Sequence, residues 1–297
     1  QMDDALLGQT RAPRRQPTVR DLLRHTAGFT YGIFGDTEVD KLYRSAGLFE
    51  QSTIREFVVE LGRMPLQYEP GSRWHYSVAV DVQGRLVEVL SGMTFGDFLR
   101  TRIFEPLGMT DTAFHVPEAK WERFVTLYSP EGTSAGLNQV WQRNTSLKLV
   151  RGDARFVDAY REGVTFEGGG GGLVSTAADY MRFSLMMLNG GELNGVRLLS
   201  PKTVELMTMN HLGDMSMGWA GPRGVGFGLG FGVLLNPGDS GEIGSAGEYS
   251  WGGAAGTRFW IDPAEQLVGV FMVQSLPHQT RLGQEFRVLT YQAIVED

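Results

Sequence analysis

The sequence has no cysteine among its 297 residues. Disulfides, thiolate nucleophiles and zinc–thiolate sites are therefore excluded, and cysteine usage gives no indication of the compartment. The five histidines are scattered, and none has the His-x-x-x-His or His-Glu-x-x-His spacing that brings metal ligands together. We expect neither a metal nor another cofactor.

Long apolar runs and excess positive charge are also missing. No uninterrupted apolar run approaches the roughly 20 residues that span a bilayer, and residues 1–10 lack the basic and apolar regions of a signal peptide. A net charge of −7 and a pI near 5.4 argue against a polyanionic partner. We expect no membrane span and no nucleic-acid binding, while localisation and oligomeric state stay open.

The first half of the chain is dominated by helical spacing, in a composition with 42% hydrophobic residues that is typical of globular proteins. Capping residues and helix-ending glycines predict helices over about 18–28, 53–61, 76–92, 94–108, 175–189 and 200–209. Residues 110–165 show no clear periodicity, and we expect a long, partly ordered excursion there.

Strand patterns replace helical spacing from about residue 225. We predict strands over 227–235, 242–251, 253–261 and 266–273, joined by short turns and therefore antiparallel. Helical spacing over 281–295 predicts a final helix that covers one face of this sheet. The expected fold class is α+β, with a mostly helical domain over 1–165 and an α/β domain over 166–297 that contains the antiparallel sheet.

Four motifs follow one another in the chain with enzyme-like spacing. They are Thr18-Val-Arg-Asp-Leu-Leu-Arg-His-Thr-Ala-Gly28, Tyr76-Ser77-Val78, Gly170-Gly-Gly-Leu-Val-Ser-Thr176 and Trp251-Gly-Gly-Ala-Ala-Gly-Thr257. Together they resemble the serine β-lactamase and penicillin-binding-protein-like superfamily, and most closely its family VIII carboxylesterases, which share the class C β-lactamase fold. The resemblance implies an antiparallel sheet flanked by helices together with an all-helical domain.

The Ser-x-x-Lys motif of that superfamily is missing, since no serine here is followed three positions later by lysine. The motif places both side chains on one helical turn, where the amine can take the hydroxyl proton. In the family it precedes the Leu-Leu-x-His-Thr segment. We therefore expect the nucleophile from an N-terminal segment upstream of this chain or from a companion polypeptide. Thr145-Ser146-Leu147-Lys148 is a look-alike, but it follows Tyr76 instead of preceding it.

The resemblance also implies roles for residues that are present. Tyr76 matches the tyrosine that relays the proton between nucleophile and leaving group. Trp251-Gly252-Gly253 matches the third motif, and the main-chain N–H of Ala254 would form half of an oxyanion hole. The alternative interpretation, from the local sequence alone, is structural: Tyr76 would be an aromatic residue at the start of a helix, and Trp251 a packed residue of a strand.

The substrate expected from these motifs is an uncharged carboxylic ester with a small or medium acyl group. The third motif of β-lactamases supplies a lysine that binds a substrate carboxylate, whereas Trp251 offers an apolar, π-rich wall. Val78 stands where those enzymes place an asparagine that contacts the substrate amide. Trp74 or Tyr249 would complete the pocket wall. The resemblance thus implies a carboxylesterase that acts through an acyl-enzyme.

Other functions remain open from the sequence. One is a weak β-lactamase or D-alanyl-D-alanine carboxypeptidase, and another is a catalytically inactive homologue that keeps the site for binding. Residues 168–172 are all glycine, but no Gly-Lys-Ser/Thr follows, so a phosphate loop is rejected in favour of close backbone approach or a flexible turn. His25 with Asp21 or Asp81 could suggest a Ser-His-Asp triad, but we expect a structural imidazole inside a helical segment.

Overall fold

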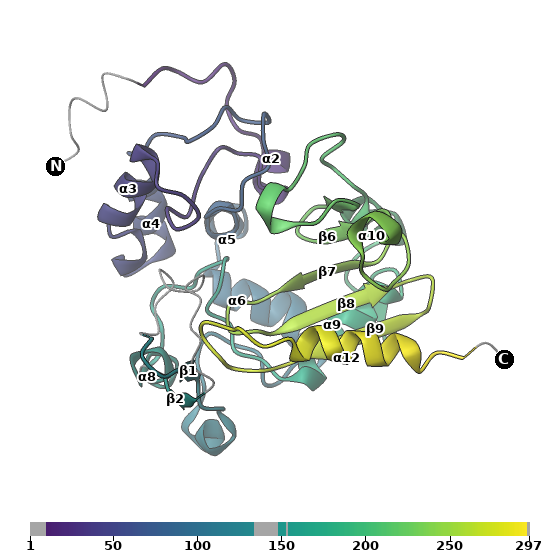
Figure 1. Cartoon of the computed structure of the whole chain (residues 1–297). Coiled ribbons are helices and arrows are strands. Elements are labelled where there is room, and N and C mark those ends of the chain that lie inside the picture. The colour runs from purple at the N-terminus through teal and green to yellow at the C-terminus, as the bar shows by residue number, and fades with distance from the viewer. Residues whose placement is uncertain (1–9, 134–147, 153, 296–297) are drawn as a thin grey trace.

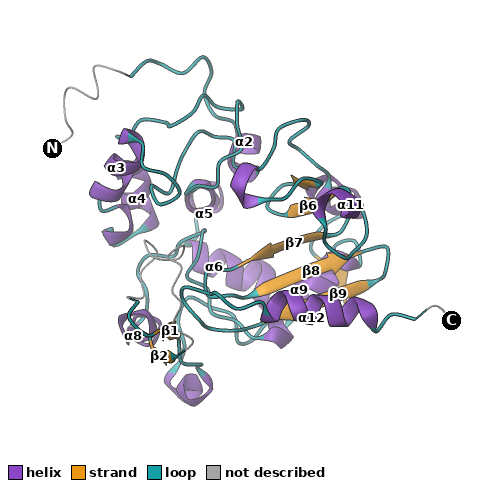
Figure 2. Ribbon diagram, in the orientation of Figure 1, coloured by secondary structure: helices purple, strands orange, loops and turns teal. Residues whose placement is uncertain are grey.

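The structure is a computed structural model that describes residues 10–133, 148–152 and 154–295 (Figure 1). Figure 2 shows helices gathered on one side of the molecule and a sheet with further helices on the other. The α+β class and the β-lactamase-like arrangement of helices and antiparallel sheet agree with the prediction. Within the described residues, no helix combines the length and apolar character needed to cross a membrane.

The helices of the first half begin where capping side chains predict them. In α2 the Thr18 side chain accepts a hydrogen bond from the Asp21 N–H, and the Asp21 carboxylate accepts one from the Thr18 N–H, which is a complete capping box. The helices up to residue 91 are α2 (Val19–Leu23), α3 (Glu38–Ser45), η1 (Leu48–Glu50), α4 (Ile54–Leu61) and α5 (Ala79–Ser91). Helix α5 ends at Gly92, whose φ of 72° is left-handed and suits glycine.

A second helical stretch runs from its Thr94 cap to Gly108, as the sequence predicts. It comprises α6 (Phe95–Leu99), the π-helical η2 (Arg100–Phe104) and α7 (Glu105–Leu107). Regular structure continues in η3 (Glu118–Arg123), β1 (Tyr128–Pro130), β2 (Leu149–Arg151) and α8 (Ala154–Glu162). The expected excursion is thus partly regular, and the look-alike residues 145–147 lie outside the described residues.

The central sheet has five antiparallel strands in sequential order. They are β5 (Val225–Phe227), β6 (Gly232–Leu234), β7 (Tyr249–Gly252), β8 (Arg258–Asp262) and β9 (Leu267–Phe271). The single strand predicted over 227–235 is wrong, because Gly230, with φ 105°, turns the chain back and the Gly228 N–H bonds the Phe231 carbonyl. The strand predicted from 242 starts only at Tyr249, after the short helix α11 (Pro237–Ser240).

Helices cover both faces of this sheet. Consecutive strand residues point to opposite faces, and on β8 Phe259 contacts Tyr180 of α9 (Ala177–Leu188) while Trp260 contacts Phe286 of α12 (Leu282–Gln292). Figure 1 shows α12 in front of β8 and β9, with α9 behind them. The remaining elements are the β3 (Glu192–Leu193) and β4 (Val196–Arg197) hairpin, α10 (Pro201–Thr208) and η5 (Gly218–Ala220). The predicted final helix is confirmed.

Buried apolar side chains form three clusters that place the site. The helical cluster contains Tyr43, Leu48, Phe57, Leu61 and Val78, and the sheet cluster is centred on residues such as Phe231, Tyr249 and Ile261. A third cluster of Trp74, Leu212, Met217 and Phe227 joins the two sides, and Tyr76 and Trp251 pack against it. Phe104 and Leu107 pack with the sheet cluster, so a domain division at residue 165 stays a prediction.

Candidate active site

Tyr76 and Trp251 meet where the helical part adjoins the sheet. Tyr76 lies in the segment just before α5, and Trp251 lies on β7. Their ring centroids are 5.5 Å apart, and both side chains are half-buried. Two motifs that are remote in sequence are therefore in contact in the fold.

Aromatic rings enclose the Tyr76 side chain. Trp74 stacks parallel to it at 6.2 Å between centroids, and His25 lies at 4.8 Å. Tyr31 at 5.3 Å and Phe34 at 5.7 Å complete the enclosure. Burial raises the pKa of Tyr76 above its usual value, although hydrogen bonding with Trp251 and Tyr31 opposes the rise. In this chain Tyr76 is thus a protonated phenol at neutral pH.

The third motif leaves its backbone open to an approaching molecule. Gly252 at the end of β7 is exposed, as are Gly253 and Ala254 in the following turn. The Gly253 N–H bonds the Thr257 carbonyl at 2.8 Å, which fixes the base of this turn. The oxyanion role of Ala254 stays a prediction, but its position is accessible.

Three predicted substrate-binding residues are buried instead. Trp74 is 4% exposed and packs beneath Tyr76, so it holds that ring in place. Val78 is fully buried among the helical cluster, and Tyr249 packs against Phe231 in the sheet cluster. Val78 is the N-cap residue of α5 and Tyr249 lies on β7, and each side chain belongs to a core cluster; substrate contact by either stays a prediction.

His25 has a structural position, as expected, although the helical placement is wrong. Helix α2 ends at Leu23, and His25 has a φ of 54° outside it. Burial, together with the charge of His75, lowers the pKa of His25 to about 3, so the imidazole is neutral. Its Nδ1 lies 3.5 Å from Ser77 Oγ, but both residues are buried, which leaves no accessible serine nucleophile in this pair.

The glycine run allows close backbone approach. A methyl group on Gly169 would lie 2.1 Å from the Val80 carbonyl oxygen, and one on Gly170 would lie 2.5 Å from the Tyr31 hydroxyl. The Gly170 N–H donates to Asp81 Oδ1 at 2.9 Å. A side chain at position 169 or 170 would clash with these neighbours, so only glycine fits there. This favours the prediction of close backbone approach over that of a flexible turn.

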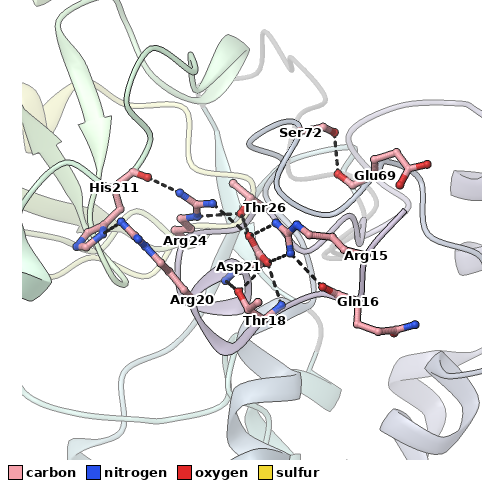
Figure 3. Close-up of polar contacts among 10 residues, drawn as sticks. All are labelled: Arg15, Gln16, Thr18, Arg20, Asp21, Arg24, Thr26, Glu69, Ser72 and His211. Carbon is pink, nitrogen blue, oxygen red and sulfur yellow. Dashed lines mark hydrogen bonds and ion pairs between the residues drawn. The ribbon is translucent and has the colours of Figure 1, made fainter. Parts of the chain in front are cut away.

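A buried polar network holds α2 against the segment after α10 (Figure 3). The Asp21 carboxylate, 1% exposed, accepts hydrogen bonds from Arg15, Arg24 and Thr26. Arg24 in turn donates to the His211 carbonyl, and Arg20 contacts the His211 ring at 2.8 Å. The network therefore links the helical side of the site to the sheet side.

Sequence reasoning missed Tyr31 and Phe34, and it considered Asp81 only as a triad partner of His25. Tyr31 and Phe34 lie in a glycine-rich turn with several aromatic residues. This composition indicates that the turn is packed, but it does not indicate which residues it packs against. Asp81 occupies the first turn of α5, where an acidic residue ordinarily complements the helix dipole. Because this common role accounts for an acidic residue at that place, the sequence did not indicate that Asp81 contacts the glycine run.

The fold and these motifs define a protein of the β-lactamase type. The chain belongs to the β-lactamase family, whose family model matches residues 3–292.

An uncharacterized protein of Mycobacterium tuberculosis is 32% identical over 286 residues, covering 93% of this chain and 67% of that protein. Lovastatin esterase of Penicillium rubens is 30% identical, covering 89% of this chain and 65% of the esterase. The solved structure of EstCE1, a hydrolase with promiscuous acyltransferase activity, superposes with a TM-score of 0.75 at 22% identity, covering 93% of this chain and 72% of that one. The chain thus spans about two thirds of the length of these relatives.

Proposed function

We propose that the complete protein is a serine hydrolase that cleaves carboxylic esters through an acyl-enzyme. The nucleophilic serine and its lysine come from sequence upstream of this chain or from a companion polypeptide. The observation that carries the proposal is the contact of Tyr76 with Trp251 at 5.5 Å beside the exposed third-motif backbone. The name of the Penicillium relative, lovastatin esterase, supports the same reaction class.

In the proposed reaction, the serine oxygen attacks the ester carbonyl and its proton passes to the lysine amine, either directly or through Tyr76, which gives its own hydroxyl proton to the lysine as it accepts the serine proton. The N–H of Ala254 donates to the developing oxyanion. The carbon–alkoxy bond then breaks, and Tyr76 delivers the proton to the departing alcohol. Water hydrolyses the acyl-enzyme by the reverse proton path.

The substrate class follows from the surroundings of the phenol. Its neighbours are the rings of His25, Tyr31, Phe34, Trp74 and Trp251. Burial keeps the His25 imidazole neutral, and an indole at position 251 offers no cation for a substrate carboxylate. An uncharged ester suits this site better than an anionic β-lactam or peptide.

The test is hydrolysis of 4-nitrophenyl acetate by the intact gene product with and without Tyr76→Phe. We expect turnover to fall by about 100-fold or more, because proton relay contributes on that scale. Tyr128→Phe is the matched control, since Tyr128 is 42% exposed on β1. Unchanged turnover in Tyr76→Phe would contradict the role of this residue.

Two further measurements separate the alternatives. Nitrocefin hydrolysis as fast as ester hydrolysis would favour a β-lactamase or D-alanyl-D-alanine carboxypeptidase. The coding sequence upstream of Gln1 provides the other measurement: an in-frame Ser-x-x-Lys supports the enzyme, and a start signal without one supports an inactive binding homologue.

A further inference from the structure

The third motif ends in a tight hairpin loop between β7 and β8. The loop is closed by two hydrogen bonds of Gly253, whose N–H bonds the Thr257 carbonyl at 2.8 Å and whose carbonyl accepts the Gly256 N–H at 3.0 Å. Gly256 has a φ of 96°, the left-handed geometry in which short hairpin loops commonly end. The N–H groups of Ala254 and Ala255, between them, donate to no other residue that the structure describes. The exposed Ala254 N–H is therefore available to a bound molecule.

The side chain of His278 packs against the buried end of this loop. His278 lies in the segment between β9 and α12. A methyl group on Gly256 would lie 2.2 Å from His278 Nδ1 and 2.5 Å from its Cγ, so the imidazole occupies the space beside the Gly256 backbone. Gly256 is buried, whereas Ala254 is exposed. The imidazole thus contacts one end of a loop whose other end is open to solvent.

A main-chain contact from the same segment holds the neighbouring loop residue. The Ser275 N–H donates to the Ala255 carbonyl at 3.0 Å, and Ser275 is buried. Ala255 and Gly256 are therefore both held by residues 275–278, the first through a backbone hydrogen bond and the second through the His278 ring. Only the ring contact can be removed by a side-chain substitution.

Hydrogen bonding does not account for a histidine at position 278. Its Nδ1 is buried without a partner among the described residues, and its Nε2 lies 3.3 Å from the Thr280 hydroxyl. Burial, together with the charge of Arg258, lowers the pKa of His278, so the ring is neutral at neutral pH. A buried polar nitrogen without a partner costs free energy. The contact of the flat ring with Gly256 gives this residue a role that does not depend on Nδ1.

We propose that His278 is a positioning residue, whose ring holds the hairpin loop at Gly256 and so keeps the Ala254 N–H in one orientation. This inference rests on the proposed function, because that proposal makes the Ala254 N–H the oxyanion donor. Such a donor acts only at the position where the oxyanion forms. A displacement of about 1 Å can lower the rate about 100-fold.

The first measurement is amide hydrogen exchange in the intact gene product, which needs no turnover. The Gly253 and Gly256 N–H groups are bonded inside the loop, so their exchange reports its opening. We expect His278→Ala to accelerate both by about tenfold or more relative to the strand amides of β8 and β9, which correct for any global loss of stability. His115→Ala, which removes an exposed ring, is the matched control and should leave both unchanged. Unchanged exchange of the two glycines in His278→Ala would overturn the proposal.

Ester hydrolysis distinguishes positioning from ordinary packing. In His278→Ala, kcat/KM for 4-nitrophenyl acetate should fall by about 10- to 100-fold. His278→Phe keeps a flat ring without Nδ1 and should recover most of that loss. Accelerated loop exchange with an unchanged kcat/KM would contradict the positioning role. A His278→Phe variant that has native circular dichroism but is as slow as His278→Ala would contradict the role of the ring.

Gly256→Ala tests the contact itself. The new methyl group would collide with the imidazole, and the left-handed φ adds a strain that does not depend on His278. The collision is absent in His278→Ala. Adding Gly256→Ala should therefore lower kcat/KM by a smaller factor in His278→Ala than in wild type. Equal factors would show that ring and loop are not coupled and would overturn the proposal.

The two proposals can fail separately. An intact protein without ester hydrolysis would defeat the esterase, while accelerated loop exchange in His278→Ala would still support the hold of His278 on the loop. Hydrolysis that depends on Tyr76, combined with wild-type exchange and kcat/KM in His278→Ala, would do the reverse.

Discussion

The Arg24 guanidinium donates a hydrogen bond of 2.6 Å to the main-chain carbonyl of His211. The His211 N–H in turn bonds the carbonyl of Phe227 at 2.8 Å, and Phe227 contacts both Trp74 and Trp251. A continuous set of contacts therefore leads from α2 to the third motif. Tyr76 stacks on Trp74, so Tyr76 and Trp251 both pack at the Phe227 end of this path.

Asp21→Asn should weaken this connection. The carboxylate is buried and accepts from Arg15 and Arg24, and loss of one partner of a buried ion pair costs about 3 kcal/mol. Urea unfolding should show that decrease in the free energy of unfolding, while Asp97→Asn should change it much less, because solvent screens the exposed pair of Asp97 with Arg100. Equal effects of the two substitutions would contradict the assignment.

The same residue sets an acid dependence. Burial alone would raise the pKa of Asp21, but hydrogen bonds from Arg15, Thr18 and Thr26 outweigh it and lower the pKa. The stabilisation is therefore present above the ordinary aspartate pKa and is lost as pH falls below it. The difference in unfolding free energy between wild type and Asp21→Asn should therefore decrease as the pH is lowered from about 5 to about 2.

The glycine run offers a matched pair of substitutions. Gly169→Ala would place a methyl group 2.1 Å from the backbone oxygen of Val80, so the segment must move away from α5. Gly171→Ala meets nothing within 4 Å. We expect Gly169→Ala to destabilise by about 1–3 kcal/mol, on the scale of overpacking, and Gly171→Ala to be nearly neutral. Thermal unfolding of both variants measures this, and similar melting temperatures would refute the close-approach explanation.

Helix starts could be predicted from the sequence because the capping interaction is local. Thr18, Thr53, Thr94, Thr176 and Ser200 all accept the hydrogen bond expected of an N-cap residue. The strand boundaries were less predictable. Gly230 turns the chain by its left-handed φ inside what is otherwise a continuous apolar pattern, so periodicity alone joined β5 and β6.

The site was predictable only where a motif marks it. Tyr76 and Trp251 could be paired because family spacing identifies both. Tyr31 and Asp81 could not, because their significance lies in contacts with Gly170, which is remote in sequence from both. The orientation of Val78 was also hidden, since it depends on how α5 packs against α4, a tertiary contact that no local pattern encodes.

His25 predicts a second pH effect with a definite sign. The pKa of His25 is about 3 in the folded protein and about 6.5 when unfolded. Between these values the unfolded state binds the proton and the folded state does not, so stability falls as pH drops below 6.5, by at most about 1.4 kcal/mol per unit from this group. Urea unfolding at several pH values between 7 and 4 gives the free energy of unfolding. This free energy should decrease more steeply with falling pH in wild type than in His25→Gln.

The control for that measurement is His115→Gln, at an exposed ring. It should keep the wild-type slope of unfolding free energy against pH. A wild-type slope in His25→Gln would instead show that other groups dominate the acid response.

Val78→Asn tests whether restoring the asparagine typical of β-lactamases can restore their substrate contact. Val78 is fully buried with Phe57 and Leu61, and an amide there would have to be desolvated among apolar side chains. We expect a loss of about 1–3 kcal/mol in unfolding free energy, and no gain in nitrocefin hydrolysis by the intact protein. Val78→Ala is the control for lost packing, at a cost set by the cavity. A stable Val78→Asn variant with new nitrocefin activity would mean that this part of α5 turns toward the substrate when the complete protein is assembled.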